Sequence, residues 1–346
     1  MEFRRDTGNL ELLSPASGFE RELQPVEYRY DPLTGSQSRV SVARAGRVRQ
    51  VQGEETDVAK LVERTAEGCA FCPGNIEERT PRFPSELIAE GRIKRGECLL
   101  FPNLYPFAEH HAVATLTERH YLELDAFTPG MLADNVAASL EYIAAVHRRD
   151  EQSKYPLWIW NHLPPSGASI VHPHVQVAVD RSPMPGIAEL IAASDAYYKQ
   201  HKVNYWQDLI EAERESGERY IGENGSLAVI AGFSPRGNRE VQLFFKDACG
   251  LTELDAGRIA DFADAVIRLL RGYKGMGVNS FNLITLSAPV GERLEHFRLS
   301  ARMISRPVFQ PLYTNDSGPL ERFLGVSVIE ALPEDVAGEM RTHFTA

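Results

Sequence analysis

One order of expected elements, strand–strand–helix–strand–strand, occurs twice along this chain, and it constrains the fold more than any other feature. Apolar runs and alternating patterns bounded by turn residues predict the strands. In the first half these are residues 96–101, 111–117, 157–161 and 169–180, and in the second half 227–233, 240–245, 280–286 and 296–304. No repeat with a period of about 20–50 residues accompanies this order. The sequence therefore predicts an α+β protein made of two related units.

A helix is expected between the strands of each half. Thr128 followed by Pro129 is a typical helix start, because Thr caps the first turn and Pro suits the first helical position. We expect Thr252 to cap the corresponding helix of the second half. A further helical region is predicted at residues 187–215, and a short helix begins near Pro333.

The length of 346 residues suggests about two domains, each large enough for its own core. Residues 1–25 are polar and lack a clear period, so we interpret them as an N-terminal extension. The first domain is expected at residues 26–185, beginning with a strand at 39–44, and the second at 186–346.

The charge balance restricts the partners of the chain. Lys and Arg number 37 and Asp and Glu 48, which leaves a net charge of −11 and argues against general nucleic-acid binding. A few arginines can still form a local pocket for one small phosphorylated ligand. The N-terminus has no apolar signal segment, and the longest apolar stretch is far shorter than the roughly 20 residues that span a bilayer. We therefore expect a cytoplasmic protein without a membrane partner.

The most informative stretch, residues 161–176, contains His172, His174 and Gln176 at alternate positions. If this segment is a strand, the three side chains project from one face, between apolar neighbours. Three polar groups in that arrangement are costly to bury without partners. The pattern therefore favours a functional site over a core histidine with one satisfied hydrogen bond.

Two of the four cysteines, Cys69 and Cys72, form a CxxC pair, whereas Cys98 and Cys249 stand alone. One pair leaves a tetrahedral zinc site two ligands short, and no second pair follows at zinc-finger spacing. A thioredoxin-like redox pair is the alternative, although the pair leads into a loop rather than a helix. That loop, residues 69–95, is long enough to need something that fixes it, such as a metal. Spacing does not choose among the histidines that could complete a site, which are His110, His111, His120, His162, His172 and His174.

Together, the His-Pro-His-Val-Gln run and the Cys-x-x-Cys-Pro-Gly-Asn run resemble the galactose-1-phosphate uridylyltransferase family of the histidine-triad superfamily. The resemblance spans most of the chain and includes residues 31–35, 44–47 and 101–107. It implies two histidine-triad-like units, each a mainly antiparallel sheet with packed helices. It also implies a homodimer.

The same resemblance implies one structural zinc held by Cys69, Cys72, His120 and His172. Such a closed site would pin the long loop to the catalytic strand. A solvated histidine at the start of the next segment is the alternative interpretation of His120.

The resemblance implies that His174 is the nucleophile. Its neutral imidazole attacks the α-phosphorus of a nucleoside diphosphate sugar and expels the sugar 1-phosphate, with ping-pong kinetics. A sugar phosphate leaves as a stable anion and needs little help from a general acid. Gln176 fits that chemistry, since its amide can donate a hydrogen bond to a phosphoryl oxygen but cannot supply a proton.

The resemblance assigns the remaining candidate residues to substrate binding. The phosphate-cradling loop corresponds to Asn161, Gly167, Ala168 and Ser169. Arg44 and Arg47 correspond to basic residues near the phosphate, and Asn103 to a nucleoside contact. The alternative interpretation is that Arg44 and Arg47 are surface charges and that Asn103 is a turn residue.

Three departures from the family pattern concern the rest of the substrate. Leu104 stands where an Asp is usual near the ribose. Ser300 and Arg302 occupy the places of histidines in a second, iron-type site, so we predict that this second metal is absent. Residues 322–328 lack the Tyr-Glu with which the hexose-recognition run of the family ends.

The sequence thus favours a zinc-containing nucleotidylyltransferase, foremost a hexose-1-phosphate uridylyltransferase that exchanges UDP-glucose and galactose 1-phosphate. An ADP-glucose phosphorylase-like enzyme with phosphate as acceptor is the closest alternative. A non-catalytic, zinc-stabilised nucleotide-binding protein is the alternative from another class.

Overall fold

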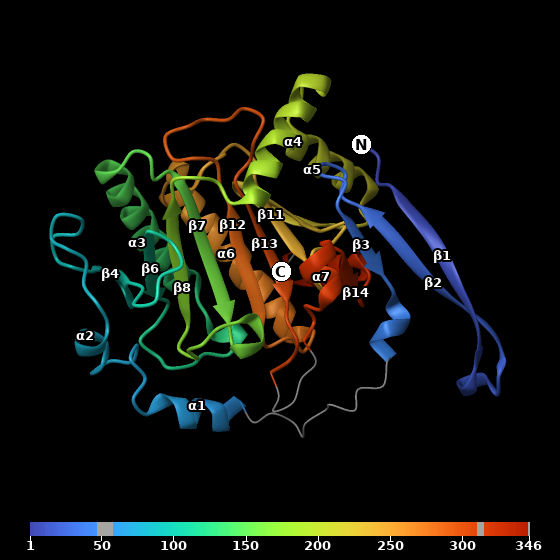
Figure 1. The fold of residues 1–346 in the computed structure, drawn as a ribbon, viewed down its shortest axis with the longest axis horizontal. Coiled ribbons are helices and arrows are strands. Elements are labelled where there is room, and N and C mark those ends of the chain that lie inside the picture. Colours follow the sequence, from blue (N-terminus) through green and yellow to red (C-terminus); the bar gives the residue numbers. More distant parts are fainter. Residues whose placement is uncertain (47–57, 310–314, 345–346) are drawn as a thin grey trace.

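The computed structural model describes residues 1–46, 58–309 and 315–344. Within these ranges, ten strands form one antiparallel sheet, to which each half of the chain contributes five (Figure 1). The first half supplies, in spatial order, β4 (Ile93–Arg95), β5 (Cys98–Pro102), β6 (His110–Thr115), β8 (His174–Asp180) and β7 (Tyr155–His162). The second half continues with β12 (Phe281–Leu286), β13 (Ser300–Ser305), β11 (Val241–Phe245), β10 (Leu227–Ala231) and β9 (Tyr220–Asn224).

The two halves repeat one topology, which confirms the α+β class and the two related units. In each half the chain makes three strands, crosses on a helix and adds two more strands, and the fifth strand pairs with the third. The halves join edge to edge because the fourth strands, β7 and β12, pair antiparallel. Since one sheet runs through both halves, the domain boundary at residue 185 stays a prediction.

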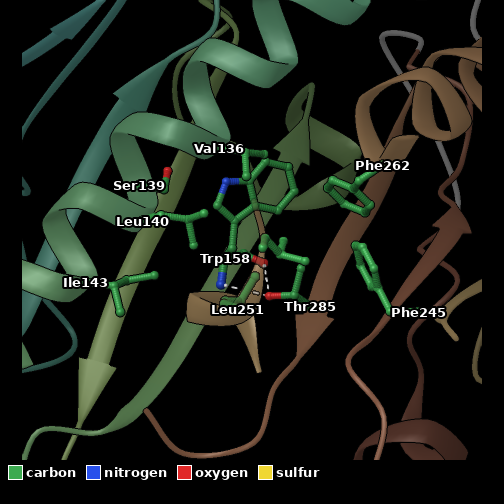
Figure 2. A pocket seen from close by; sticks show the side chains of 10 residues that line it. Val136, Ser139, Leu140, Ile143, Trp158, Phe245, Leu251, Phe262 and Thr285 are labelled. Carbon is green, nitrogen blue, oxygen red and sulfur yellow. Dashed lines mark hydrogen bonds between the residues drawn. The ribbon is translucent and has the colours of Figure 1, made fainter. Parts of the chain in front are cut away.

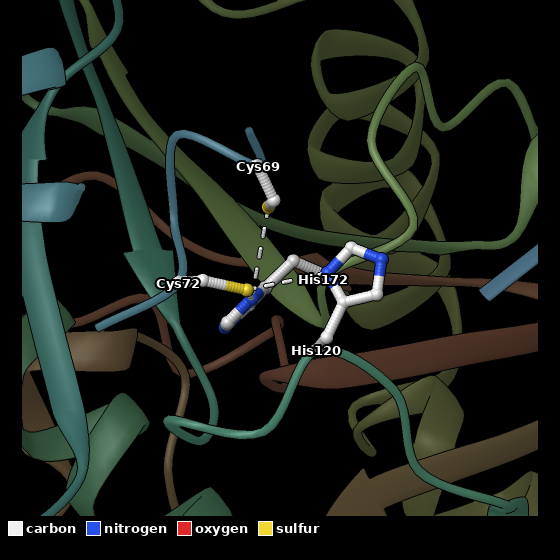
Figure 3. Close-up of side chains that lie close together, drawn as sticks. All are labelled: Cys69, Cys72, His120 and His172. Carbon is white, nitrogen blue, oxygen red and sulfur yellow. Dashed lines mark hydrogen bonds between the residues drawn. The ribbon is translucent and has the colours of Figure 1, made fainter. Parts of the chain in front are cut away.

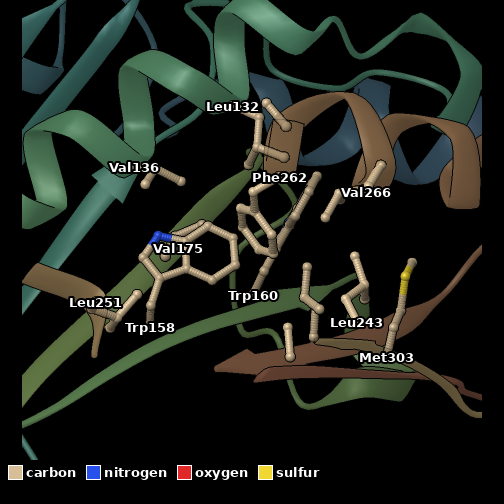
Figure 4. Packing of buried hydrophobic residues seen from close by; sticks show 14 of the residues in the cluster. Leu132, Val136, Trp158, Trp160, Val175, Leu243, Leu251, Phe262, Val266 and Met303 are labelled. Atoms are coloured by element: carbon tan, nitrogen blue, oxygen red, sulfur yellow. The ribbon is translucent and has the colours of Figure 1, made fainter. Parts of the chain in front are cut away.

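Helices cover one face of the whole sheet. These are α3 (Pro129–Arg149) over the first half and α6 (Ala256–Gly275) over the second (Figure 1), with α8 (Pro333–Phe344) packed against α6. The largest hydrophobic cluster lies between helices and sheet, with Trp158, Trp160 and Phe262 among its buried side chains (Figure 4). Among the described residues, no helix is both long and apolar enough to cross a membrane.

The opposite face of the sheet is covered mainly in the second half. There α4 (Pro185–His201) and α5 (Tyr205–Ser216) contribute Leu190, Trp206 and Leu209 to a second cluster. Successive residues of β10 belong to different clusters, because Val229 packs toward α6 and Ile230 toward α5. Both faces of the second half are therefore buried, whereas the corresponding face of the first half is where His174 and Gln176 lie.

A second sheet lies beside the second half (Figure 1). It consists of β1 (Arg5–Ser14), β2 (Glu20–Tyr30), β3 (Gln37–Val40) and β14 (Ser327–Ile329), the last parallel to β3. The expected N-terminal extension thus forms a long hairpin, which sequence patterning missed because most of its side chains on both faces are exposed. Buried Arg29 anchors the hairpin to α8 through two hydrogen bonds to Glu334.

Several expected element bounds are corrected. The strand predicted at 39–44 ends at Val40, and a 3₁₀ turn over Val42–Gly46 follows. The helix α6 is capped by Asp255, whose side chain accepts from the Arg258 amide, while Thr252 lies in the preceding turn. The region 187–215 divides into α4 and α5 at Lys202, which adopts a left-handed conformation. Thr128 caps α3 as predicted.

A small cavity lies between α3, α6 and the sheet (Figure 2). Its volume of about 10 Å³ is close to the minimum that holds one water molecule. Apolar side chains dominate its wall, among them Leu140, Trp158 and Phe262. This cavity therefore belongs to the core and offers no room for a substrate.

One buried polar residue ties α3 to the sheet. Asn135, fully buried, donates to the carbonyls of Ala114 and Thr115 and accepts from the indole of Trp158. We expect Asn135→Leu to lower the free energy of unfolding by about 2–4 kcal/mol, because these buried groups lose their partner. Ser139→Ala is the control and should cost less than about 1 kcal/mol, since its hydroxyl only supplements a helical bond. Urea unfolding measures both, and equal effects would contradict this role of Asn135.

Candidate active site and metal centre

The strand that carries the site begins at His174, five residues later than the sequence predicted. Its partner β6 ends at Thr115, and Pro173, which has no N–H to donate, precedes the strand. His172 is therefore not on the strand face with His174 and Gln176, as alternation suggested. It lies in the preceding loop, and its ring turns toward the cysteines.

The tautomer of His172 is set by a backbone carbonyl. Its Nε2 lies 2.8 Å from the carbonyl oxygen of Thr117, which can only accept, so Nε2 carries the proton. The lone pair is then on Nδ1, which lies 3.5 Å from the Cys72 sulfur and 4.0 Å from the Cys69 sulfur. His172 thus presents a metal-binding nitrogen to the two thiols.

His120 is oriented in a similar way by the short helix α1 (Val58–Ala66), which sequence patterning missed. The hydroxyl of Thr65 donates to the carbonyl of Leu61 and so accepts from Nε2 of His120, at 2.9 Å. The remaining nitrogen, Nδ1, lies 3.4 Å from the Cys72 sulfur.

Four ligand atoms, from Cys69, Cys72, His120 and His172, lie within 4.8 Å of one another (Figure 3). Burial, together with the nearby Cys69 thiol, raises the pKa of Cys72 to about 12, so a bound cation would favour the Cys72 thiolate. Two thiols and two imidazole nitrogens held by outer hydrogen bonds are the donor set of a closed structural zinc site. The cluster could therefore bind a metal ion, and zinc is the ion that these donors fit.

The metal-binding loop also packs against the residue expected to be the nucleophile. The ring of Phe71, between the two cysteines, meets the ring of His174 edge-on with centroids 5.4 Å apart. Phe71 also packs edge-on against Phe101 of β5, at 5.3 Å. The loop that holds the metal ligands is thus one wall of the site around His174.

His174 is almost completely buried and is held in one tautomer. Its Nδ1 lies 2.8 Å from the backbone carbonyl oxygen of His172, so this nitrogen carries the proton and donates it. Burial lowers the pKa of His174, partly offset by that hydrogen bond, which favours the neutral ring. The unprotonated nitrogen is therefore Nε2, which has the lone pair that a nucleophile needs.

Asn161 lies beside His174 on the same face, because Trp160 of β7 pairs with Val175 of β8. Its Oδ1 accepts from Asn282 of β12, at 2.6 Å, which leaves the NH₂ group of Asn161 to face a ligand. Asn282 is in turn held by Arg306, which donates to its Oδ1 at 2.8 Å. Sequence reasoning missed both residues, because only the pairing of β7 with β12 reveals that the second half reaches the site.

The predicted phosphate loop follows β7. Leu163 and Gly167 both have positive φ angles, of 66° and 92°, and they bracket a short 3₁₀ turn; only Gly167 is in the left-handed helical conformation. Ala168 is buried and Ser169 is exposed on the way to His172. A left-handed position at residue 167 favours glycine and makes the loop compact.

Comparisons with known proteins cover nearly the whole chain, although no family model matches it. An uncharacterized protein from Archaeoglobus fulgidus is 31% identical over 350 residues, which span 99% of this chain and 98% of that protein. A galactose-1-phosphate uridylyltransferase from Neurospora crassa is 24% identical over 311 residues, 73% of this chain and 78% of the relative.

The chain is thus similar to a galactose-1-phosphate uridylyltransferase, the family that its sequence motifs resemble. An ADP-glucose phosphorylase from Arabidopsis thaliana with bound ADP-glucose has the same fold, with a TM-score of 0.72 and 20% identity. The match covers 91% of this chain and 98% of the plant enzyme.

Asn103 lies at the edge of the site. Its backbone pairs with His111, whose side chain contacts Gln176. Asn103, Leu104 and His111 line an open cavity of about 410 Å³ at this end of the sheet. Leu104 is 62% exposed, so the departure at this position places an apolar side chain where the family pattern has a carboxylate.

Arg44, by contrast, lies in the turn after β3 and is exposed. It lines a second cavity, of about 610 Å³, together with Arg239, Arg306 and Asp316. The other predicted phosphate arginine, Arg47, lies outside the described residues.

Ser300 and Arg302 lie on β13, where the family pattern has its second metal site. Ser300 is buried, and the guanidinium of Arg302 lies 3.7 Å from the carboxylate of Glu240. A guanidinium is no metal ligand, and the expected lack of an iron-type site stays a prediction.

The metal cluster generates a stability prediction. We expect the purified protein to contain about one zinc per chain, and chelation to lower its Tm by several degrees, because a closed site contributes folding free energy. Cys72→Ser should abolish binding, whereas Cys98→Ser, at a buried cysteine outside the cluster, should retain the metal. Metal analysis with thermal unfolding checks this. Full zinc content in Cys72→Ser would contradict the assignment.

Proposed function

We propose that this protein transfers a nucleotidyl group from a nucleoside diphosphate sugar through a covalent intermediate on His174. The observation that carries the proposal is the hydrogen bond from Nδ1 of His174 to the His172 carbonyl, which leaves Nε2 as an unprotonated nucleophile. The similarity to a galactose-1-phosphate uridylyltransferase supports this reaction class.

In the first displacement, Nε2 of His174 forms a bond to the α-phosphorus, and the bond from that phosphorus to the sugar-phosphate oxygen breaks. The electron pair leaves with the sugar 1-phosphate. The ring becomes positively charged while it keeps its Nδ1 proton, and the His172 carbonyl stabilises that charge. In the second displacement, a phosphate oxygen of the acceptor attacks the same phosphorus and releases His174 in its neutral form.

Gln176 and Asn161 lie on the same face as the nucleophile and are proposed to bind the phosphoryl oxygens. Each offers an amide NH₂, so each can stabilise charge that develops at phosphorus without moving a proton. The structural metal, when bound, supplies rigidity to the loop behind His174 rather than a reacting group. Gly167, Ala168 and Ser169 are proposed to add backbone and hydroxyl donors to the same phosphates.

For the acceptor we propose a hexose 1-phosphate, with galactose 1-phosphate and UDP-glucose as the leading pair. Support comes from the cavity at Arg44, Arg239 and Arg306, where Asp316 pairs with Arg306 and Glu321 also contributes a carboxylate. Guanidinium groups suit a phosphate, and carboxylates suit sugar hydroxyls. The homodimer and the cytoplasmic location expected from the sequence stay predictions.

A phosphorylase that uses inorganic phosphate is the second candidate. The observation that favours it is the altered acceptor region, because residues 322–328 lack Tyr-Glu and instead form the end of α7 (Pro319–Leu324) and the start of β14. Inorganic phosphate contains no hexose, so an enzyme that uses it as the acceptor does not need residues that recognise the acceptor's sugar.

The covalent step can be tested by labelling. We expect UDP-glucose or ADP-glucose that contains ³²P at the α-phosphorus to label the wild type, and the label to be lost in His174→Gln because the nucleophile is gone. His110→Gln is a matched control in the next strand and should label normally. A wild type that binds these nucleotides without becoming labelled would contradict the proposal and favour a non-catalytic binding protein.

The acceptor is identified by discharging the labelled enzyme. We expect galactose 1-phosphate to release the label as a nucleoside diphosphate sugar at least ~10-fold faster than inorganic phosphate does, since the cavity offers groups for both ends of the acceptor. Release followed by rapid quenching measures the two rates. Faster discharge by phosphate would reject the uridylyltransferase version and support the phosphorylase.

A further inference from the structure

His111 contacts the proposed catalytic amide directly. It belongs to β6, next to β8, and its side chain is 5% exposed. Its Nε2 lies 3.0 Å from Oε1 of Gln176. On the other side of the ring, the backbone N–H of Phe107 donates to Nδ1, at 3.2 Å.

The backbone N–H of Phe107 fixes the direction of the hydrogen bonds that run from Phe107 through His111 to Gln176. A backbone N–H can only donate, so Nδ1 of His111 must be the unprotonated nitrogen, and Nε2 must carry the proton. That proton can only be donated, so the group of Gln176 that faces His111 must be its carbonyl oxygen. This assignment follows from the polarity of the Phe107 amide and does not depend on how the side-chain amide is drawn.

The orientation of Gln176 has a chemical consequence. A side-chain amide has two orientations of similar shape, one of which presents NH₂ to a ligand and the other its oxygen. An oxygen that faces a phosphoryl oxygen repels the charge that develops there, whereas NH₂ stabilises it. With Oε1 taken up by His111, the NH₂ group is the end that remains for the phosphate.

We propose that His111 is a positioning residue that holds the amide of Gln176 with its NH₂ group toward the reacting phosphorus. This inference rests on the proposed function, since it needs Gln176 to act on a phosphoryl group. His111 packs against the exposed ring of Phe107, with centroids 4.0 Å apart and the ring planes tilted by 47°, so one loop sets both the position and the tautomer of the imidazole. Burial lowers the pKa of His111, which keeps the ring neutral as this role requires.

The same loop orients a second amide. The backbone N–H of Tyr105 donates to Oδ1 of Asn103, at 2.9 Å, so the NH₂ group of Asn103 points the other way. It lies 3.2 Å from Nε2 of His111. Both groups are donors, so neither satisfies the other, and the Asn103 hydrogens remain for a ligand acceptor. Backbone amides of residues 105 and 107 thus orient two side-chain amides at the edge of the site.

The test compares single-turnover labelling of His174 in five proteins: the wild type, three single variants and one double variant. We expect His111→Phe, which keeps an aromatic ring but has no donor, to slow labelling by ~10- to 100-fold, part of the loss typical for removing one such donor. His111→Gln restores an N–H near the Nε2 position and should recover much of that rate. In a Gln176→Ala background, His111→Phe should change the rate by less than about twofold, because it acts through Gln176.

The outcomes separate this inference from the proposed function. An unlabelled wild type overturns both. If the wild type is labelled and His111→Phe is labelled at the same rate, only the inference is overturned. It is also overturned if the rate losses of His111→Phe and Gln176→Ala multiply in the double variant, because that result indicates a merely structural role for His111. If His111→Phe does not fold, ¹⁵N NMR of the wild-type histidines decides: a proton on Nε2 of His111 supports the inference, and a proton on Nδ1 overturns it.

Discussion

Two backbone carbonyl groups determine the chemistry of the central histidines. The carbonyl of Thr117 accepts from Nε2 of His172, and the carbonyl of His172 accepts from Nδ1 of His174. Since a carbonyl only accepts, the two rings carry their protons on opposite nitrogens. His172 therefore presents Nδ1 to the cysteines, while His174 keeps Nε2 for a phosphorus atom. Two residues of one type, two positions apart, thus become a candidate metal ligand and a candidate nucleophile.

These hydrogen bonds need the rest of the fold to hold them. The metal-binding loop places Phe71 against His174, and α1 orients His120 through Thr65. From the other half of the chain, Asn282 reaches across the β7–β12 junction and holds Asn161. The two halves of the sheet therefore differ in role. Both faces of the second half are buried and support the site, whereas one face of the first half is available for the site.

The predictable parts of this structure are those with local causes. Thr128 and Pro129 predict the start of α3 because capping acts within one turn. The CxxC pair and the His-x-His-x-Gln run indicate a metal site and a catalytic site by their residue types alone. What escaped prediction depends on distant partners. His172 lies outside strand β8 because the partner strand β6 ends at Thr115, opposite His174. The contacts of Asn282 and His111 with site residues depend on strand pairing. Arg44 lies in the turn after β3 and lines the cavity shared with Arg239 and Arg306, and its role at a phosphate stays a prediction.

The most direct measurement of the central claim is the position of the phosphorus on the imidazole ring. Protein with ¹⁵N-labelled histidine would be incubated with a nucleoside diphosphate sugar, digested, and the nucleotidylated peptide analysed by ³¹P–¹⁵N NMR. Our account predicts a single attachment, at Nε2 of His174, because Nδ1 is occupied by the His172 carbonyl. Attachment at Nδ1, or on any residue other than His174, would contradict it.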